Sequence, residues 1–327
     1  MTINWQPWQQ WVARHRHFML TTHVRPDGDG LGSMKALARA LEVLGRQTSL
    51  VLPSSLPDRY RFLFADCRVL RYEPGQAQWA ACDGVVILDT GTWNQLGELG
   101  AWLRDTPVER VVIDHHRTQD DLGAQCFVDP AAEATGRLTR EAIAALGVAL
   151  DAVMAEALFV AVAMDTGWFR HSNVRPETFA LAAELARHGV CPERLYNQLF
   201  EQNSLARMRL MAEVLDRLTL TAQGQVAYSY ILLDDYARLG ATPQDSEDLV
   251  NVTLAVAGVH VGLLFMEQPR GGTKVSLRSR DRVDVGRLAE SFGGGGHKQA
   301  AGVLLPTSLE QARATLLSAV EKCFPPG

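Results

Sequence analysis

The sequence predicts an α/β protein with two domains. In the first half, short apolar segments alternate with segments of helical periodicity. This alternation is typical of a layered domain in which helices cover both faces of a parallel sheet. From about Leu218 the pattern changes to short strands paired across glycine-containing turns. A length of 327 residues also exceeds that of one typical core. We therefore expect an N-terminal parallel-sheet domain, a helical connector and a smaller C-terminal α/β domain.

The strands predicted for the first domain are short, apolar and rich in β-branched residues, as in parallel strands buried on both faces. They are residues 18–22, 49–52, 84–88 and 110–113. Apolar residues at helical spacing predict a helix after the first strand and more helices in the middle of the chain. These helices are residues 32–44, 132–146, 153–164, 177–188 and 191–215.

The change of pattern places a domain boundary within residues 205–220. Residues 1–210 are expected to form the first domain with its connector, and residues 211–327 the second domain. The strands expected in the second domain are residues 218–221, 226–232, 259–265, 273–279 and 301–304. The helices expected there are residues 246–257 and 285–292.

Composition and charge argue against several classes of protein. Binding of duplex DNA over a broad surface needs many basic side chains, and the net charge here is −5. No apolar run approaches the roughly 20 residues of a membrane-spanning helix. The five cysteines are scattered, which predicts reduced, mostly buried thiols. We therefore expect a cytoplasmic protein that binds neither membrane nor duplex DNA. The oligomeric state is left open, with a homodimer as one option.

Three polar segments directly follow apolar runs of the first domain. The combined stretches read FMLTTHVRPDGDG, VVILDTG and VVIDHHR. In a parallel sheet all three emerge at the carboxyl edge, where α/β proteins bind ligands. A fourth acid, Asp165, follows the apolar helical residues 155–164. Together the four segments predict one metal site, with the ligands His23, Asp27, Asp29, Asp89, His115 and Asp165.

The charge and donor types of this site favour two divalent ions. Four carboxylates match the charge of two such ions, and without metal they would raise one another's pKa values. Carboxylates and imidazoles without thiolate favour Mn²⁺, with Mg²⁺ as the alternative, and a metal pair serves phosphoryl chemistry. Gly28 and Gly30 are expected to allow unusual backbone angles beside Asp27 and Asp29. Taken singly, each segment is more often a turn or a strand end, so the prediction depends on their combination.

At these positions the sequence resembles the DHH family of phosphoesterases. The matching stretches are HVRPDGDGLGS at 23–33, LDT at 88–90, DHH at 114–116 and MDTGWF at 164–169. Near the other end, VSLRS at 275–279 and GGGGHKQAAG at 293–302 resemble the DHH-associated C-terminal domain. The chain is most similar to the compact nano-RNase and pAp-phosphatase branch. It shows neither the extra domains of RecJ-type exonucleases nor the membrane segments of cyclic-dinucleotide phosphodiesterases.

The resemblance implies two metal sites that share Asp89. The other ligands would be His23 and Asp27 for one metal, and Asp29, His115 and Asp165 for the second. Asp114 would orient an imidazole, and His116 would face the substrate phosphate and donate a proton to the leaving group. Members of the family often have a glutamate where this chain has Arg137, which leaves the role of that helix open.

The substrate is expected to contact the second domain. Residues 270–298 carry seven basic and three acidic side chains, a local excess of positive charge that suits an anion. Arg278 is the preferred phosphate ligand, with an exposed edge strand as the alternative interpretation. A glycine run followed by His297 is expected to form a binding loop rather than a flexible linker. Its members at the binding site are Gly294, Gly295 and Gly296.

The activity implied by the resemblance is manganese-dependent hydrolysis of phosphate esters. The expected substrates are short single-stranded oligonucleotides, degraded from an end, and phosphoadenosine phosphate, converted to AMP. One alternative is hydrolysis of polyphosphate, pyrophosphate or a cyclic or linear dinucleotide at the same metal site. Another is a regulator that binds nucleotides without catalysis, although the presence of all six expected ligands argues against it.

Overall fold

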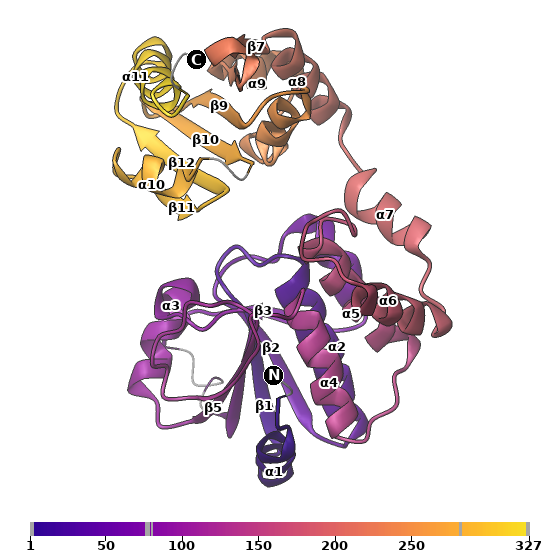
Figure 1. Ribbon diagram of the computed structural model, residues 1–327. Helices are drawn as coiled ribbons and strands as arrows, with labels where there is room; N and C mark the ends of the chain where they lie inside the picture. The colour runs from indigo at the N-terminus through magenta and orange to yellow at the C-terminus, as the bar shows by residue number, and fades with distance from the viewer. Residues whose placement is uncertain (1–2, 76–78, 80, 281–282, 325–327) are drawn as a thin grey trace. The chain divides into compact units, whose positions relative to one another are not determined.

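The computed structural model describes residues 3–75, 79, 81–280 and 283–324 (Figure 1). The chain divides into two compact units, Met1–Gln202 and Asn203–Gly327. Each unit has its own six-stranded sheet, with a hydrophobic core on either face of it. The predicted α/β class, with a parallel sheet in the first half and a smaller α/β unit in the second, is confirmed.

A parallel sheet forms the centre of the first unit. Its strands are β1 (His17–Thr21), β2 (Gln47–Leu52), β3 (Val69–Arg71), β4 (Gly84–Leu88), β5 (Glu109–Asp114) and β6 (Gln125–Val128). Their order is β3-β2-β1-β4-β5-β6, and each neighbouring pair is parallel. From β1 the chain continues to β2 and β3 on one side, and from β4 it continues to β5 and β6 on the other side. The loops that follow β1 and β4 therefore leave the carboxyl edge of the sheet in opposite directions. Open parallel sheets bind their ligands at such a point.

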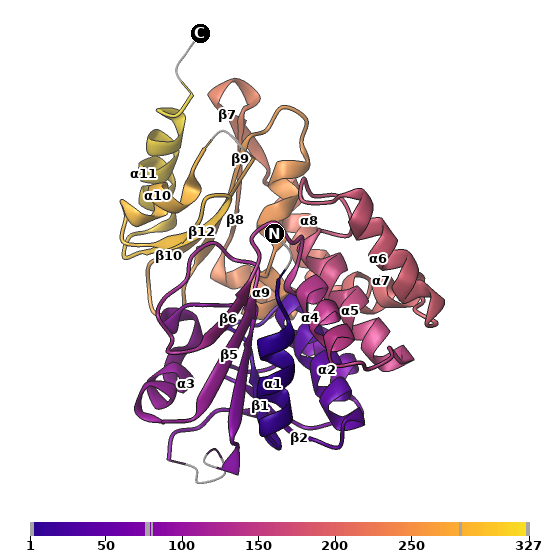
Figure 2. The same cartoon turned by 60° about the horizontal axis from the view of Figure 1, so that its bottom comes forward.

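Helices cover both faces of this sheet (Figure 2). They are α1 (Gln6–Arg14), α2 (Gly28–Val43), α3 (Trp93–Asp105), α4 (Thr135–Ala145), α5 (Ala152–Asp165), α6 (Pro176–Arg187) and α7 (Pro192–Phe200). Side chains of α1, α2, α4 and α5 share one core with Leu20 and Val86. Side chains of α3 share a second core with Met19 and Ile87. Successive residues of β1 and β4 thus enter different cores, as the two-residue period of a strand requires.

The sheet of the second unit is ordered β11-β12-β10-β9-β8-β7. Its strands are β7 (Thr219–Thr221), β8 (Val226–Ile231), β9 (Val261–Glu267), β10 (Thr273–Ser279), β11 (Gly295–His297) and β12 (Ala300–Leu305). β8 and β9 are parallel, whereas the other described neighbours are antiparallel. The helices are α8 (Leu205–Asp216), α9 (Leu233–Leu239), α10 (Val285–Glu290) and α11 (Leu309–Glu321). α10 and α11 pack with Leu263 on one face, and α8 packs with Leu264 on the other.

Two helix predictions are wrong. The helix predicted at residues 191–215 is divided, because α7 ends at Phe200 and Ser204 caps α8 by accepting the N–H of Arg207. The helix predicted at residues 246–257 is replaced by the 3₁₀ helices η4 (Pro243–Ser246) and η5 (Leu249–Ala255). Asp248 separates them with a φ of 60°, which no α-helix can accommodate.

The prediction of mostly buried thiols is also wrong. Cys82 is buried and Cys67 half-buried, but Cys126, Cys191 and Cys323 are exposed. Cys126 lies on the edge strand β6, and the other two lie beside helix ends, where neighbours cover only one side. All five are free thiols. Among the described residues, no helix is both long enough and apolar enough to cross a membrane.

Candidate metal centre

The polar segments singled out in the sequence lie at the carboxyl edge of the first unit's sheet. His23 comes two residues after β1, Asp89 directly after β4, and His115 directly after β5. The other three candidates come from helix ends: Asp27 caps α2, Asp29 is in its first turn, and Asp165 ends α5. The switch point between β1 and β4 therefore brings residues from distant parts of the chain together.

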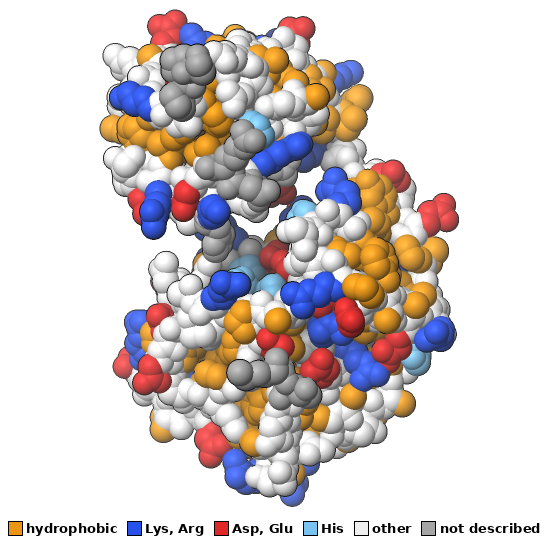
Figure 3. Space-filling view, in the orientation of Figure 1, with side chains coloured by type: hydrophobic (Ala, Val, Ile, Leu, Met, Phe, Trp, Pro, Cys, Tyr) orange, Lys and Arg blue, Asp and Glu red, His pale blue; other side chains and the backbone are white. Residues whose placement is uncertain are grey.

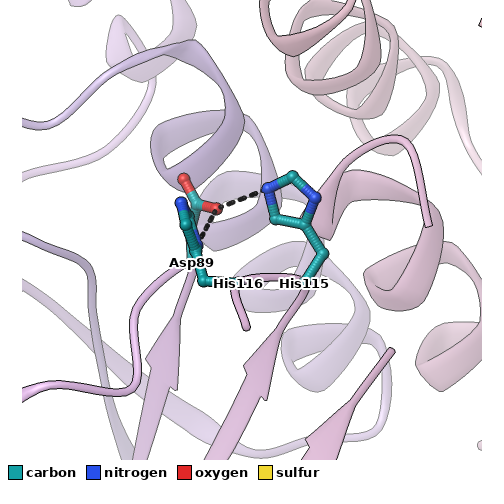
Figure 4. A group of neighbouring side chains, drawn as sticks. All are labelled: Asp89, His115 and His116. Carbon is teal, nitrogen blue, oxygen red and sulfur yellow. Dashed lines mark ion pairs between the residues drawn. The ribbon is translucent and has the colours of Figure 1, made fainter. Parts of the chain in front are cut away.

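Asp89 lies between two histidines, and its two oxygens face different ones. Asp89 Oδ2 is 3.5 Å from His23 Nε2, and Asp89 Oδ1 is 3.7 Å from His115 Nε2 (Figure 4). His23 Nε2 is also 3.7 Å from Asp27 Oδ1. These separations are too long for hydrogen bonds, but two donors that are each about 2.1 Å from one ion lie about 3–4 Å apart. The Asp89 carboxylate can therefore bridge two ions.

A second donor group surrounds His115. Its Nε2 lies 3.8 Å from Asp29 Oδ2 and 3.7 Å from Asp165 Oδ2. Donor atoms lie within 4.8 Å of one another in three groups among the described residues. These groups are His23, Asp27 and Asp89; Asp29, His115 and Asp165; and Asp89, His115 and His116. All six expected ligands thus meet at one place.

Backbone carbonyls set the orientation of both histidines. His23 Nδ1 lies 2.9 Å from the carbonyl oxygen of Val24, and His115 Nδ1 lies 3.2 Å from that of Ala132. A carbonyl oxygen only accepts, so each Nδ1 carries the hydrogen and donates it. The lone pair of each Nε2 is then available to a metal ion.

Without a cation, the carboxylates of this centre destabilise one another. Burial raises the pKa of Asp29 well above its usual value, and the charges of Asp89 and Asp165 raise it further. Burial also raises the pKa of Asp165 to about 6. Burial opposes protonation of His23, but its contacts with Asp27 and Asp89 outweigh that effect and raise its pKa to about 11. The centre therefore favours positive charge between its carboxylates, which a divalent ion supplies together with a matching donor set.

The start of α4 binds two of these carboxylates. The N–H groups of Thr135 and Gly136 donate to Asp29 Oδ2 and Oδ1, at 2.7 and 2.8 Å. The Thr135 hydroxyl donates to Asp89 Oδ1 at 2.9 Å. A helix N-terminus stabilises negative charge through such N–H groups. Thr135 was missed as a functional residue, although a helix start after the histidine segment was visible in the sequence.

Asp114 and His116 form a pair beside the ligands. Asp114 is fully buried, and its Oδ1 accepts from the backbone N–H of His116 at 3.1 Å and from His116 Nδ1 at 2.7 Å. The hydrogen bond to Asp114 raises the pKa of His116 to about 9, against the effect of burial. His116 Nδ1 also lies 3.8 Å from Asp89 Oδ1 (Figure 4). The His116 side chain is about half-exposed, so a ligand could reach it.

Arg137 occupies the position where the family resemblance predicted an acidic residue. Its guanidinium forms an ion pair with Glu133. Two of its guanidinium nitrogens lie 2.5 Å from the carboxylate oxygens of Glu133, which is four residues earlier and just before α4. Glu133 is only 5% exposed, and its carbonyl oxygen accepts from Asn173 Nδ2 at 3.0 Å. The same amide lies 3.4 Å from the carbonyl oxygen of Asp165. Arg137 therefore belongs to a partly buried ion pair with Glu133, and the Asn173 amide links Glu133 to the end of α5.

The role expected for Gly28 and Gly30 is wrong. Both lie in the first turn of α2, and neither has a positive φ. Glycine is needed there because the surroundings leave no room for a side chain. A Cβ at Gly28 would lie 2.3 Å from Met164 Cγ, and one at Gly30 would lie 2.1 Å from Thr22 Oγ1. Unusual backbone angles occur instead at Arg25, with a φ of 54°, and at Asp89, whose φ of 64° turns the chain sharply after β4.

Apart from His116, the residues expected to contact substrate are in the second unit. Arg278 on β10 pairs with Ala300 on β12, which pairs in turn with His297 on β11, so the three are aligned across the sheet. Arg278 is about one-quarter exposed and lies 3.4 Å from Asp248 Oδ1. The side chain of His297 lies outside the described part of the structure. Figure 3 shows basic side chains on the visible surface of both units.

The second half of the glycine run before His297 lies in a strand, and substrate binding by this run stays a prediction. Gly295 and Gly296 belong to β11 and pair with β12. A Cβ at Gly294 would lie 2.4 Å from the carbonyl oxygen of Gly302, and one at Gly296 would lie 2.4 Å from that of Ala300. The neighbouring strand thus leaves no room for a side chain at these two positions, whereas a Cβ at Gly295 would meet nothing within 4 Å.

Comparison with known proteins matches both units to family models. The DHH family N-terminal domain matches residues 17–165, and the DHHA1 domain matches residues 223–325. A Thermus thermophilus protein is 33% identical over 308 residues, which are 93% of this chain and 89% of that protein. It is named a bifunctional oligoribonuclease and PAP phosphatase. The chain belongs to the DHH family. As a member of its oligoribonuclease and PAP phosphatase branch, it is a hydrolase of phosphoester bonds.

Further relatives agree with this assignment. A Bacillus subtilis protein of the same name is 25% identical, over 89% of this chain and 90% of its own length. Among solved structures, an exopolyphosphatase-related protein from Bacteroides fragilis superposes with a TM-score of 0.91 at 24% identity. The superposition covers 97% of this chain and 95% of that one, and shows that the two share a fold. The DHH domain thus carries the donor groups, and the DHHA1 domain carries Arg278.

Proposed function

We propose that this chain is a manganese-dependent phosphoesterase that removes nucleotides from the ends of very short oligonucleotides. We propose further that it removes the 3′-phosphate of phosphoadenosine phosphate to give AMP. The proposal depends on the position of Asp89, which has one carboxylate oxygen facing His23 and the other facing His115. The names of the relatives from Thermus thermophilus and Bacillus subtilis support the choice of substrates.

The donor set supports two ions of one kind. His23, Asp27 and Asp89 would hold the first, and Asp29, Asp89, His115 and Asp165 the second. Among the described residues, no donor group contains a cysteine, and carboxylate with imidazole suits Mn²⁺ better than a structural zinc site. Two bound divalent ions would lower the pKa of water and neutralise charge on the phosphoryl oxygens.

The chain's own residues would position the reacting groups. The N–H groups of Thr135 and Gly136 hold the Asp29 carboxylate still, and the Thr135 hydroxyl does the same for Asp89. His116, with its Nδ1 hydrogen bonded to Asp114, would donate a proton to the leaving ribose oxygen. In the DHHA1 domain, Arg278 would bind a phosphate of the substrate. Positioning and charge account for most catalysis of phosphoryl transfer.

The deciding experiment is a substrate panel. Purified protein is incubated with Mn²⁺ and labelled RNA and DNA of increasing length, phosphoadenosine phosphate and polyphosphate, and initial rates are ranked. We expect the highest rates on the shortest oligonucleotides and on phosphoadenosine phosphate, and no activity after chelation of metal. Faster hydrolysis of polyphosphate than of dinucleotides would overturn the choice of substrate.

A pair of variants tests the metal site itself. Asp89→Asn should abolish hydrolysis and weaken Mn²⁺ binding, because it removes the charge shared by both donor groups. Asp58→Asn is the matched control, since the Asp58 side chain is 86% exposed. If Asp89→Asn folds and retains the activity of the control, the bridging role is wrong.

A further inference from the structure

The loop after β5 is closed by the side chain of Gln119. Gln119 Nε2 donates to Asp114 Oδ2 at 2.6 Å and to the carbonyl oxygen of His116 at 3.0 Å. The other oxygen of Asp114 accepts from His116, through its backbone N–H and its Nδ1. A single amide group therefore holds both the carboxylate that orients His116 and the backbone of His116.

The hydrogen-bond partners of the Gln119 amide determine the positions of its nitrogen and its oxygen. Both atoms that face Gln119 Nε2 are acceptors, so the nitrogen and not the oxygen must lie there. Gln119 Oε1 is buried and makes no hydrogen bond within the described structure. A buried carbonyl oxygen without a partner is unfavourable, so the two hydrogen bonds of Nε2 must hold this conformation.

Gly91 provides the space in which the amide lies. A Cβ at Gly91 would be 1.6 Å from Gln119 Oε1, so any side chain at this position would displace the amide. The carbonyl oxygen of Gly91 also accepts the N–H of Asp120 at 2.8 Å. The loop after β4 thus holds Gln119 next to the pair of Asp114 and His116.

We propose that Gln119 is a positioning residue that fixes the ring of His116 toward the substrate phosphate by holding Asp114. A carboxylate held at one oxygen can rotate about its Cβ–Cγ bond, and a bond at the second oxygen prevents that rotation. The inference rests on the proposed function, in which His116 protonates the leaving oxygen. Gln119 contacts none of the six metal ligands through a side-chain hydrogen bond in the described structure, so its loss should act on His116 alone.

The kinetic test uses Gln119→Met, which keeps the length of the side chain and removes the amide. On a dinucleotide we expect kcat to fall about 10–100-fold, as for other residues that orient a catalytic group. KM and Mn²⁺ affinity should stay within about twofold of wild type. A nitrophenyl phosphodiester has a leaving group that needs no proton, so its kcat should change little. Equal losses on both substrates, or a loss confined to KM, would overturn the proposal.

Gly91→Ala provides a second variant that displaces the amide without deleting it. Alone it should lower kcat on the dinucleotide in the same way. Added to Gln119→Ala, which leaves space for the methyl group, it should cause little further loss, since interacting residues are not additive. Gln10→Met, at an exposed glutamine of α1, is the matched control and should behave as wild type. Fully additive losses would contradict a shared mechanism.

A measurement without turnover separates this inference from the proposed function. The Nδ1 proton of His116, bonded to a carboxylate, should give a downfield imidazole resonance, assigned by its absence from His116→Gln. We expect Gln119→Met to shift or broaden that resonance. If it does so in a protein that hydrolyses none of the substrates, the positioning role stands and the proposed function fails. An unchanged resonance overturns the positioning role whatever the activity.

Discussion

Thr135 is bonded to Asp89 and Asp29 at once, through its hydroxyl at 2.9 Å and its backbone N–H at 2.7 Å. Asp89 needs such support, because its φ of 64° is costly for a residue with a side chain. Thr135 is completely buried, so water cannot replace its hydroxyl. The first residue of α4 therefore connects the strained turn after β4 to the first turn of α2.

Thr135→Val is expected to weaken the metal centre while preserving its shape. Valine has nearly the volume of threonine but lacks the hydroxyl, so Asp89 Oδ1 loses a hydrogen bond in a buried place. We expect Mn²⁺ affinity and activity to fall about 10–100-fold. Titration of Mn²⁺ by calorimetry and steady-state kinetics measure the two effects.

Thr135→Ser is the control for this prediction, because it keeps the hydroxyl and loses a methyl group. It should retain most of the activity. Equal activity of the valine and serine variants would show that the hydroxyl contributes nothing.

Gly30 and Thr22 are in close contact at the start of α2. A Cβ at Gly30 would lie 2.1 Å from Thr22 Oγ1 and 3.0 Å from Thr22 Cβ. Gly30→Ala should therefore destabilise the DHH domain by roughly 1–3 kcal/mol, the usual effect of overpacking a core. Urea unfolding measures the difference. Gly295→Ala is the control, since a Cβ there meets nothing within 4 Å.

Removing the Thr22 hydroxyl should restore the stability lost in Gly30→Ala. Thr22 Oγ1 is buried and makes no hydrogen bond among the described residues, so Thr22→Ala loses little. In that background Gly30→Ala should cost much less, because alanine also favours the helix more than glycine does. The same loss in both backgrounds would mean that a different contact excludes the side chain.

The sequence was sufficient to predict that the candidate donor side chains meet, because most of them follow an element with a clear pattern. His23, Asp89 and His115 come after apolar strands, and the parallel arrangement of those strands brings them to one edge. Asp165 ends an apolar helix, and the helical pattern placed it there. Periodicity and sheet topology together therefore determine where these side chains meet.

The supporting contacts were not predictable in the same way. Thr135 donates to Asp89, which is 46 positions away in the sequence. The spacing of apolar residues in the sequence gives no sign of such a contact. Gly28 and Gly30 were misinterpreted, because sequence alone does not distinguish a glycine needed for its backbone angle from one needed for close packing. The break between α7 and α8 depends on the cap at Ser204, which interrupts an otherwise continuous helical pattern.

Asp235 makes the stability of the second unit depend on pH. Burial alone would raise its pKa, but Arg217 and the N–H of Leu232 outweigh burial and lower the pKa from 3.8 to about 2. Arg217 donates to Asp235 Oδ1 at 2.9 Å. Because the folded pKa lies below the unfolded one, this stabilisation is complete above about pH 4 and is lost as pH falls toward 2. The shift corresponds to roughly 2 kcal/mol.

Asp235→Asn should therefore lower the free energy of unfolding at pH 7 by at least this amount. The difference from wild type should shrink between about pH 4 and pH 2, where wild type loses the same charge. Urea unfolding at a series of pH values measures it. Asp234→Asn, at the exposed neighbouring position, should show no such trend. A difference that stayed constant down to pH 2 would contradict the assigned pKa.

Substitution of Arg278 tests whether the DHHA1 domain binds substrate. Lys274, Ser276 and Arg278 alternate along β10 with buried residues, so all three lie on the more exposed face. Arg278 is held near Asp248, and a held guanidinium binds a phosphate with two hydrogen bonds at little further entropic cost. Arg278→Ala should therefore raise KM for a dinucleotide about tenfold and leave kcat nearly unchanged, the pattern expected when ground state and transition state lose the same contact.

Two matched variants sharpen the prediction for Arg278. Arg278→Lys keeps the charge without the planar fork and should fall between wild type and alanine. Lys274→Ala removes a positive charge from the same face of the same strand and should raise KM much less, because a flexible lysine is not directed to one phosphate. Equal effects of Arg278→Ala and Lys274→Ala would indicate that the strand attracts anions only through its overall charge. In that case KM should also rise steeply with salt, whereas a directed contact should survive it better.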